Sequence, residues 1–275
     1  MSVSFEGRVA IVTGAGAGLG RCHALGLAER GAKVVVNDLG VATDGSGSGS
    51  DAARAVVEEI RAAGGHAIAN GADVTSADDT RKMVDEAIAE FGHVDILVNN
   101  AGILRDKSFA KMDLSDFAKV LDVHLMGTVN CCKAVWTHMA AREYGRIVVT
   151  TSCSGMYGNF GQSNYGAAKA GVVGLMNTLA IEGAKKNVLV NAVSPGLVVT
   201  PLTAPAMDIP GVKDDYVANT PLGRPGTPEE VAAAVSWLCS EESSWMTGEV
   251  MDLNGGAHTQ RYPDLLGHVN RMLGT

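Results

Sequence analysis

The chain has 275 residues, of which 46% are hydrophobic and only 5% aromatic, and its formal net charge is −8. This length suits one large α/β domain with a core of aliphatic side chains. The acidic balance, with no run of Lys or Arg longer than two residues, excludes nucleic-acid binding, which needs clustered basic side chains.

Short apolar, β-branched runs alternate along the chain with stretches of helical periodicity. The predicted strands are Val9–Thr13, Lys33–Asn37, His66–Asn70, Ile96–Asn99, Arg146–Thr151, Val188–Val193 and Glu249–Asp252. The predicted helices lie near residues 19–30, 51–63, 76–91, 115–141, 164–186 and 227–240. Such alternation predicts a doubly wound parallel sheet with helices on both faces.

Three segments depart from this alternation. Residues 40–50 form a glycine- and serine-rich loop, which is predicted to be a mobile surface excursion. The proline-rich segment 201–226 follows a strand's carboxyl end, where open α/β sheets bind ligands, so it is interpreted as a substrate lid. The C-terminal tail, 257–275, is expected to pack against a partner subunit through its apolar residues Tyr262, Leu265, Leu266 and Met272.

The cysteines and the N-terminus indicate a cytoplasmic protein. Five cysteines are present, an odd number, and no pair has metal-ligand or CxxC spacing, so we expect reduced thiols and no metal site. Glu6 and Arg8 precede the first apolar run, which argues against a signal peptide. No apolar run approaches the roughly 18 residues that span a bilayer, so no membrane partner is expected.

The loop after the first predicted strand carries a glycine cluster, Thr13–Gly20 (TGAGAGLG). Glycines allow a tight turn and a close approach to a pyrophosphate, and the following helix offers free N–H groups. Alone, the cluster would also fit an ordinary βα turn. The second strand, however, leads into Asp38, 18 residues beyond Gly20, where an acidic residue bonds the ribose 2′-hydroxyl. A carboxylate there favours NAD(H) over NADP(H), whose 2′-phosphate it would repel.

A second group of polar residues carries the predicted chemistry. Tyr165 and Lys169 are four residues apart at the start of a predicted helix and therefore share one face. A nearby cation would lower the tyrosine pKa from about 10 toward the working pH. Ser152 ends the fifth strand and could donate a hydrogen bond to a substrate oxygen. The Tyr/Lys pair alone would equally fit an ordinary helix surface.

Taken together, these motifs resemble the short-chain dehydrogenase/reductase family over residues 5–257. They are TGAGAGLG, Asn99–Gly102, Ser152, the Tyr165/Lys169 pair and Pro195–Thr200. The resemblance implies a single Rossmann-type domain over residues 1–275, with strand order 3-2-1-4-5-6-7, and a homodimer or homotetramer. It also implies that Asp73 meets the adenine, that Asn100–Gly102 line its ribose, and that Lys169 bonds the nicotinamide ribose.

The expected cofactor site then comprises the following residues: Gly14, Gly18, Leu19, Gly20, Asp38, Asp73, Val74, Asn100, Ala101, Gly102, Tyr165, Lys169, Pro195, Val198 and Thr200. One position departs from the family pattern. The family usually carries an Asn 24 residues past Asn100, whose backbone carbonyl holds a proton-relaying water. Here this position is His124, which we retain as a catalytic candidate beside the alternative of a helix histidine without chemistry.

Several stretches resemble one branch more narrowly, the (3R)-hydroxyacyl-CoA dehydrogenase domain of peroxisomal multifunctional enzyme type 2. They are Asn37–Gly40, Asn100–Asp106, Val123–Leu125 and Tyr157–Gln162. This likeness implies 3-hydroxyacyl-CoA thioesters as substrates and, in some members, 17β-hydroxysteroids. The chain carries neither hydratase nor carrier domain and does not end in a peroxisomal tripeptide, so a free-standing relative is expected.

Two sets of side chains are candidates for binding such a substrate. Arg105, Lys107 and Lys111 could meet CoA phosphates, although a solvated face explains them equally well. An apolar pocket wall could be formed by Met156, Tyr157, Phe160, Leu202 and Met207, although core packing explains some of them.

The sequence therefore predicts an NAD-dependent oxidoreductase that interconverts a small-molecule secondary alcohol and its ketone. In this hypothesis Tyr165 is the general acid and base, Ser152 polarises the substrate oxygen, and Lys169 tunes the tyrosine. The favoured substrate is a 3-hydroxyacyl-CoA; alternatives are a hydroxysteroid or a 3-oxoacyl carrier-protein thioester, whose reductases usually take NADPH. A non-catalytic NAD-binding regulator is the alternative from a different class.

Overall fold

A seven-stranded parallel sheet forms the centre of the computed structural model, which describes residues 3–47 and 51–259. Its strand order is β3-β2-β1-β4-β5-β6-β7, as the family resemblance implied. The strands are β1 (Val9–Thr13), β2 (Lys33–Asn37), β3 (His66–Asn70), β4 (Ile96–Asn99), β5 (Gly145–Thr150), β6 (Val188–Pro195) and β7 (Val250–Leu253). The first four match the predicted ranges, and the last three differ from them by one or two residues.

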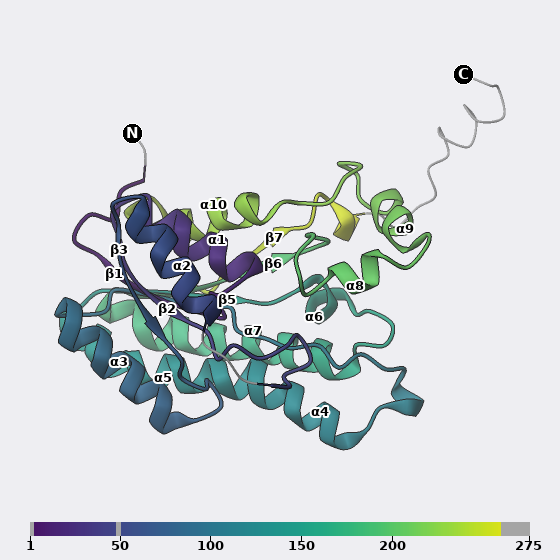
Figure 1. Ribbon diagram of the computed structural model, residues 1–275, viewed down its shortest axis with the longest axis horizontal. Coiled ribbons are helices and arrows are strands. Elements are labelled where there is room, and N and C mark those ends of the chain that lie inside the picture. The colour runs from purple at the N-terminus through teal and green to yellow at the C-terminus, as the bar shows by residue number, and fades with distance from the viewer. Residues whose placement is uncertain (1–2, 48–50, 260–275) are drawn as a thin grey trace.

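Helices cover both faces of this sheet (Figure 1). The first face carries α1 (Gly18–Ala28), α2 (Asp51–Ala62) and α10 (Pro228–Leu238), and the second carries α3 (Ala77–Phe91), α5 (Gly127–Arg142) and α7 (Ser163–Gly183). Each layer buries its own aliphatic cluster against the strands, because strands in a parallel sheet are apolar on both faces. The doubly wound architecture predicted from the alternation is confirmed.

The predicted helix over residues 115–141 is wrong as a single element. The structure has α4 (Leu114–Leu121), a π-helical turn at Asp122–Met126, and then α5. The hydroxyl of Thr128, in the first turn of α5, donates to the carbonyl of His124 in the π-helical turn, at 2.7 Å. Hydrophobic periodicity does not reveal such a widened turn, because the apolar face continues across it.

The smaller elements lie mostly around the carboxyl edge of the sheet. They are the short helices α6 (Cys153–Tyr157), α8 (Ala204–Met207) and α9 (Val212–Ala218), with 3₁₀ turns at Phe109–Lys111, Ala184–Lys186, Glu241–Ser243 and Ala257–Thr259. Helices α8 and α9 were not predicted within the 201–226 segment. No helix in the described part of the chain has both the length and the hydropathy of a membrane span. The tail residues Tyr262, Leu265, Leu266 and Met272 lie outside the described residues.

Candidate active site

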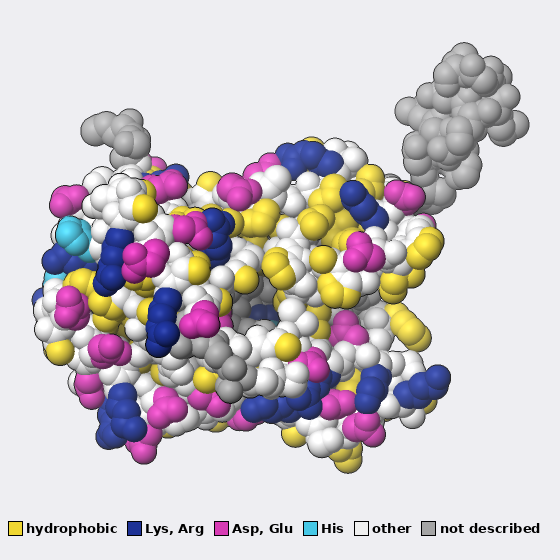
Figure 2. Space-filling view, in the orientation of Figure 1, with side chains coloured by type: hydrophobic (Ala, Val, Ile, Leu, Met, Phe, Trp, Pro, Cys, Tyr) yellow, Lys and Arg dark blue, Asp and Glu magenta, His cyan; other side chains and the backbone are white. Residues whose placement is uncertain are grey.

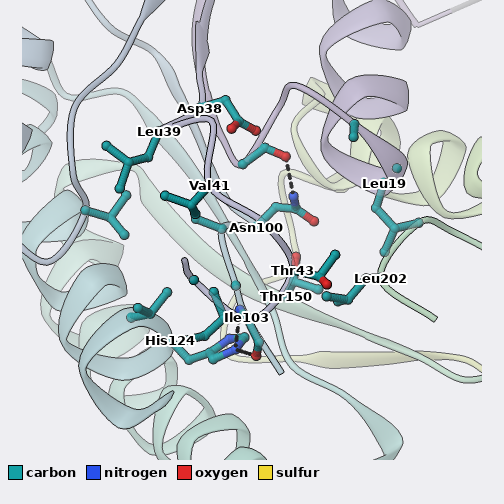
Figure 3. A pocket seen from close by; sticks show the side chains of 18 of the residues that line it. Leu19, Asp38, Leu39, Val41, Thr43, Asn100, Ile103, His124, Thr150 and Leu202 are labelled. Carbon is teal, nitrogen blue, oxygen red and sulfur yellow. Dashed lines mark hydrogen bonds between the residues drawn. The ribbon is translucent and has the colours of Figure 1, made fainter. Parts of the chain in front are cut away.

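A cavity opens beyond the carboxyl ends of β1, β2, β4 and β5. The space-filling view shows a hollow near the middle of the molecule, with apolar side chains gathered on the α8–α9 side (Figure 2). Its wall runs from Asp38 at one end to His124, Tyr165 and Lys169 at the other. In the close-up, Asp38 and His124 occupy opposite ends of the view (Figure 3). This is the crevice in which open α/β sheets bind ligands.

Glycines bring the backbone of the β1–α1 loop close to its neighbours. Gly14 has a φ of 60°, and a Cβ there would lie 2.8 Å from the Cα of Ala101. At Gly20 a Cβ would lie 2.0 Å from the carbonyl oxygen of Gly14, so only glycine fits. Helix α1 has no side-chain hydrogen bond at its N-cap, which leaves N–H groups at its start for an anionic ligand. These residues fit the pyrophosphate of a dinucleotide.

Two backbone amides hold the carboxylate of Asp38 at the end of β2. The Gly16 N–H donates to Oδ2 at 2.8 Å, and the Gly40 N–H donates to Oδ1 at 2.7 Å. Each oxygen keeps a lone pair, so the carboxylate can also accept from the hydroxyls of a ribose. A Cβ at Gly16 would lie 2.8 Å from Oδ2, so this glycine is needed for the close approach.

The loop that follows Asp38 is part of the cavity wall. Ala42, Thr43 and Asp44 in this loop are exposed, as expected for a surface excursion, and the mobility of the loop stays a prediction. Val41, Ala42, Thr43 and Gly45 line the cavity. The loop docks on the segment after β4: the Leu104 N–H donates to the Thr43 carbonyl at 3.0 Å, and Arg105 Nε donates to the Asp44 carbonyl at 2.9 Å. The composition of this segment predicts only a loop. The two bonds that dock it are accepted by backbone carbonyls, which carry no sequence signature.

Tyr165 lies near the start of α7, partly buried, on the wall of the cavity. The hydroxyl of Ser152, the N-cap of α6, acts on the phenol as a hydrogen-bonding group. Burial raises the pKa of Tyr165 to about 12, while this hydrogen bond acts in the opposite direction. Desolvation of the phenolate is thus the larger effect in the protein alone. The predicted lowering of the tyrosine pKa, to which the positive charge of an oxidised nicotinamide would contribute, stays a prediction.

Lys169 lies one helical turn beyond Tyr165 and is almost fully buried, with 4% of its surface exposed. Its Nζ donates to the Thr150 carbonyl at 2.6 Å and lies 5.6 Å from the centre of the tyrosine ring. Desolvation lowers the pKa of Lys169 to about 7. The predicted i, i+4 arrangement of Tyr165 and Lys169 therefore does bring both side chains to the same end of the cavity.

The ring of His124 packs edge-on against the ring of Tyr165, with the centroids 5.1 Å apart and the planes at 88°. Its Nε2 lies 2.8 Å from the carbonyl oxygen and 3.1 Å from the amide nitrogen of Ile103. One tautomer donates to the carbonyl and the other accepts from the amide. Burial and the charge of Lys169 lower the pKa of His124 to about 3, so the ring is neutral at physiological pH.

Most of the predicted site residues share this cavity. Those on its wall are Gly14, Gly18, Leu19, Asp38, Asp73, Val74, Asn100, Ala101, Gly102, His124, Tyr165, Lys169 and Thr200. Gly20, Ser152, Pro195 and Val198 do not line it. Gly20 lies beneath the loop, whereas Ser152 joins the site through its hydrogen bond with Tyr165.

Two of the three basic residues proposed for CoA phosphates already have acidic partners. Arg105 pairs with Asp116 at 2.9 Å, and Lys107 pairs with Asp113 at 2.6 Å and with Asp116 at 2.9 Å. These ion pairs compensate the positive charges, which weakens their case as phosphate ligands.

Comparison with known proteins agrees with this geometry. A family model described as enoyl-(acyl carrier protein) reductase matches residues 14–258. Peroxisomal multifunctional enzyme type 2 of Drosophila melanogaster is 51% identical over 237 residues, which cover 86% of this chain and 37% of that protein. The 3-oxoacyl-[acyl-carrier-protein] reductase FabG of Staphylococcus epidermidis is 41% identical over 90% of this chain and 98% of its own length. The chain thus spans about a third of the multifunctional relative.

Solved structures resemble the fold closely. A 7α-hydroxysteroid dehydrogenase complexed with NADH and 7-oxo glycochenodeoxycholic acid is 34% identical, with a TM-score of 0.85 over 92% of this chain and 95% of that one. A gluconate 5-dehydrogenase from Burkholderia cenocepacia, in complex with NADP and tartrate, is 31% identical, with a TM-score of 0.87 over 93% of this chain and 97% of that one. Both structures hold a nicotinamide cofactor.

Proposed function

Since the chain belongs to the short-chain dehydrogenase/reductase family of nicotinamide-dependent oxidoreductases, we propose that it interconverts a 3-hydroxyacyl-CoA and its 3-oxoacyl-CoA with NAD(H). One observation carries the catalytic part of this proposal. The phenol of Tyr165 lies one helical turn from Lys169 and is influenced by the hydroxyl of Ser152, at one end of a cavity that has Asp38 at the other. A regulator that only binds a nucleotide has no need of these three side chains.

The residues divide the chemistry between them. A bound nicotinamide cofactor supplies the hydride acceptor or donor and, when oxidised, a positive charge beside the phenol. In oxidation, the phenolate of Tyr165 takes the proton of the substrate hydroxyl; in reduction, the phenol returns it. Ser152 donates a hydrogen bond to the substrate oxygen. Lys169 contributes positive charge when it is protonated, and it offers a donor for ribose hydroxyls. The backbone carbonyl of His124 is proposed to hold the water through which the proton leaves.

Tyr165→Phe tests this division of roles. The variant keeps the ring and its packing on His124 but loses the hydroxyl, so turnover should fall by about 10³-fold or more. Binding of NADH, followed by its fluorescence, should stay within about twofold of the unmodified protein. Substantial remaining turnover contradicts the proposed mechanism.

Asp38 supports NAD(H) over NADP(H), because both of its oxygens face donors and a 2′-phosphate would meet its negative charge. Asp38→Asn should therefore raise KM for NAD and reduce the discrimination against NADP by about 10- to 100-fold. Asp44→Asn, an acidic position in the same loop, is the matched control. A preference of the unmodified enzyme for NADPH contradicts the proposed use of NAD(H).

Two relatives support the acyl thioester substrate: a multifunctional peroxisomal enzyme and a 3-oxoacyl carrier-protein reductase. An NADH absorbance screen over 3-hydroxyacyl-CoAs of several lengths, 3-oxoacyl carrier-protein thioesters and steroid alcohols tests it. The enantiomer consumed at C3 should be determined in the same assay. The steroid dehydrogenase structure favours a hydroxysteroid as second candidate. If the protein turns over none of these substrates but binds NADH tightly, the alternative of a non-catalytic NAD-binding regulator is favoured instead.

The assembly and compartment belong to the same proposal. Trp245 and Ile181 expose 101% and 81% of their surfaces, and such large apolar side chains are suited to burial between copies in a homodimer or homotetramer. Light scattering that returns a monomer mass contradicts this. All five cysteines are free, and Cys131, Cys132 and Cys239 are buried, which supports a reducing compartment such as the cytoplasm.

A further inference from the structure

The segment after β4 is tied to the residues that lead into Tyr165. Three hydrogen bonds join the two segments: Asn164 Nδ2 to the Arg105 carbonyl at 2.9 Å, Gln162 Nε2 to Asp106 Oδ2 at 2.8 Å, and the Lys107 N–H to the Gly161 carbonyl at 2.9 Å. Consecutive residues on one side thus bond to a short run on the other. This arrangement fixes the start of α7 against the loop that also carries the docked Thr43–Gly45 segment.

Gln162 reaches further, to the helix that Ser152 caps. Its Oε1 accepts from the Ser154 hydroxyl at 2.7 Å and from Asn159 Nδ2 at 3.1 Å. Ser154 in turn donates its backbone N–H to the hydroxyl oxygen of Ser152, at 3.2 Å. The amide of Gln162 therefore bonds in opposite directions: its nitrogen donates toward Asp106 and its oxygen accepts from α6.

We propose that Asp106 and Gln162 are positioning residues, which together hold Ser152 and Tyr165 at the spacing that proton transfer requires. This inference rests on the proposed function and deepens it. Ser152 and Tyr165 come from different segments, and a hydrogen bond between their hydroxyls depends on how α6 and α7 are placed. Gln162 joins both segments through a single rigid amide, and Asp106 fixes the orientation of that amide by accepting from its nitrogen.

The carboxylate of Asp106 also acts on Tyr165 through its charge. The groups near the phenol are Lys169 on its own helix, His124 from the π-helical turn, Ser152 and Cys153 from the α6 side, and Asp106 from the loop after β4. Asp106 raises the pKa of Tyr165, whereas the Ser152 hydrogen bond lowers it. Partial burial raises the pKa of Asp106 itself, against the hydrogen bond from Gln162.

A swap of the amide and the acid tests the positioning role. Gln162→Glu places a second carboxylate against Asp106 and breaks their hydrogen bond, so kcat should fall about 10- to 100-fold. The double variant Asp106→Asn with Gln162→Glu restores a donor opposite an acceptor, with the polarity reversed, and kcat should recover to within about fivefold. The Kd of NADH should change little in either variant, because neither residue lines the cofactor cavity.

Failure of the positioning role and failure of the proposed function give different results. If Gln162→Glu keeps the kcat of the unmodified enzyme, or if the double variant is no better than the single one, the positioning role is overturned. If the unmodified enzyme has no turnover, or Tyr165→Phe keeps it, the proposed function fails instead.

A second measurement does not depend on Gln162→Glu folding. Asp106→Asn alone removes a negative charge near the phenol, so the pH at half-maximal oxidation should move down by about 0.3 to 1 unit. Asp113→Asn, which removes an equal charge from a more distant exposed position, should leave that pH in place. An unchanged or upward-shifted profile for Asp106→Asn overturns the electrostatic part of the proposal.

Discussion

At the Asp38 end of the cavity, two backbone amides hold the carboxylate of Asp38, and glycines allow the chain to approach itself closely. The loops and short helices before α7 and around α8 and α9 present apolar side chains to solvent, and we propose that they form the substrate rim: Phe160, Leu222 and Ile209 expose 90%, 67% and 55% of their surfaces. The first end has its geometry fixed before any ligand arrives. The second exposes apolar area that a ligand could cover.

This difference separates what the two ends can recognise. A cofactor has a constant shape, so a preformed cradle of backbone groups can bind it with little rearrangement. An acyl chain or a steroid varies in length and outline, and exposed apolar side chains on short helices and loops can adapt to it. Tyr165 and the buried Lys169 lie on the cavity wall at the end opposite Asp38, where we expect the cofactor and the substrate to meet.

Among the predicted effects, the largest is the loss of cofactor binding on substitution of Gly20. Gly20→Ala would place a Cβ against the backbone of Gly14, which cannot move aside without distorting the β1–α1 loop. We expect the Kd of NADH to rise by about 100-fold or more, because misplaced backbone N–H groups no longer meet the pyrophosphate. Gly174→Ala, in open space on the exposed side of α7, is the matched control and should leave the Kd unchanged. A normal Kd for Gly20→Ala would show that the cradle is less rigid than we infer.

The sequence predicts the features that depend on local patterns and misses those that depend on contacts between distant segments. The strand order follows from the family resemblance. Strand ranges and the glycine cradle follow from local patterns: apolar runs, turn glycines and an acid at the end of β2. The docked loop at Val41–Gly45, the π-helical turn at Asp122–Met126 and the bridging role of Gln162 do not. Each depends on contacts between distant segments, and a single sequence carries no signal for those contacts. The raised pKa of Tyr165 in the protein alone has the same origin, since burial is a property of the assembled protein.

Lys169, at the end of the cavity opposite Asp38, should give the protein a pH-dependent stability. Its pKa of about 7 in the folded protein lies below the usual lysine value of 10.5, so between these values the unfolded chain binds more protons. The unmodified protein therefore gains stability as the pH rises from 7 to 10, and Lys169→Met lacks that gain. The difference in unfolding free energy, variant minus unmodified, should fall by roughly 3 kcal/mol over this range.

Urea denaturation at several pH values measures this difference directly. Using the difference removes the fixed cost of leaving the Thr150 carbonyl without its donor, which is the same at every pH. A pH-independent difference would mean that Lys169 keeps an ordinary pKa in the folded protein.

The substrate rim should respond in KM alone. Phe160→Ser removes an exposed apolar ring, and burial of such a side chain by a ligand is worth about 1.5 to 3 kcal/mol. For a long-chain 3-hydroxyacyl-CoA we therefore expect KM to rise about 10-fold, while KM for a four-carbon acyl chain and the Kd of NADH stay constant. Equal effects on both chain lengths would place Phe160 outside the acyl path and weaken the contrast between the two ends.

His124 should give the smallest effect, although its ring touches Tyr165. With a pKa of about 3 the ring stays neutral, so His124→Asn should leave both limbs of the pH–rate profile in place between pH 5 and 10. An asparagine side chain carries a donor and an acceptor, whereas Nε2 alone can satisfy only one of the two Ile103 groups that it faces. That gain offsets part of the aromatic contact, worth about 1 kcal/mol, so kcat should stay within about threefold. A shifted limb would instead assign the imidazole itself to the proton path, because the backbone carbonyl is the same in both proteins.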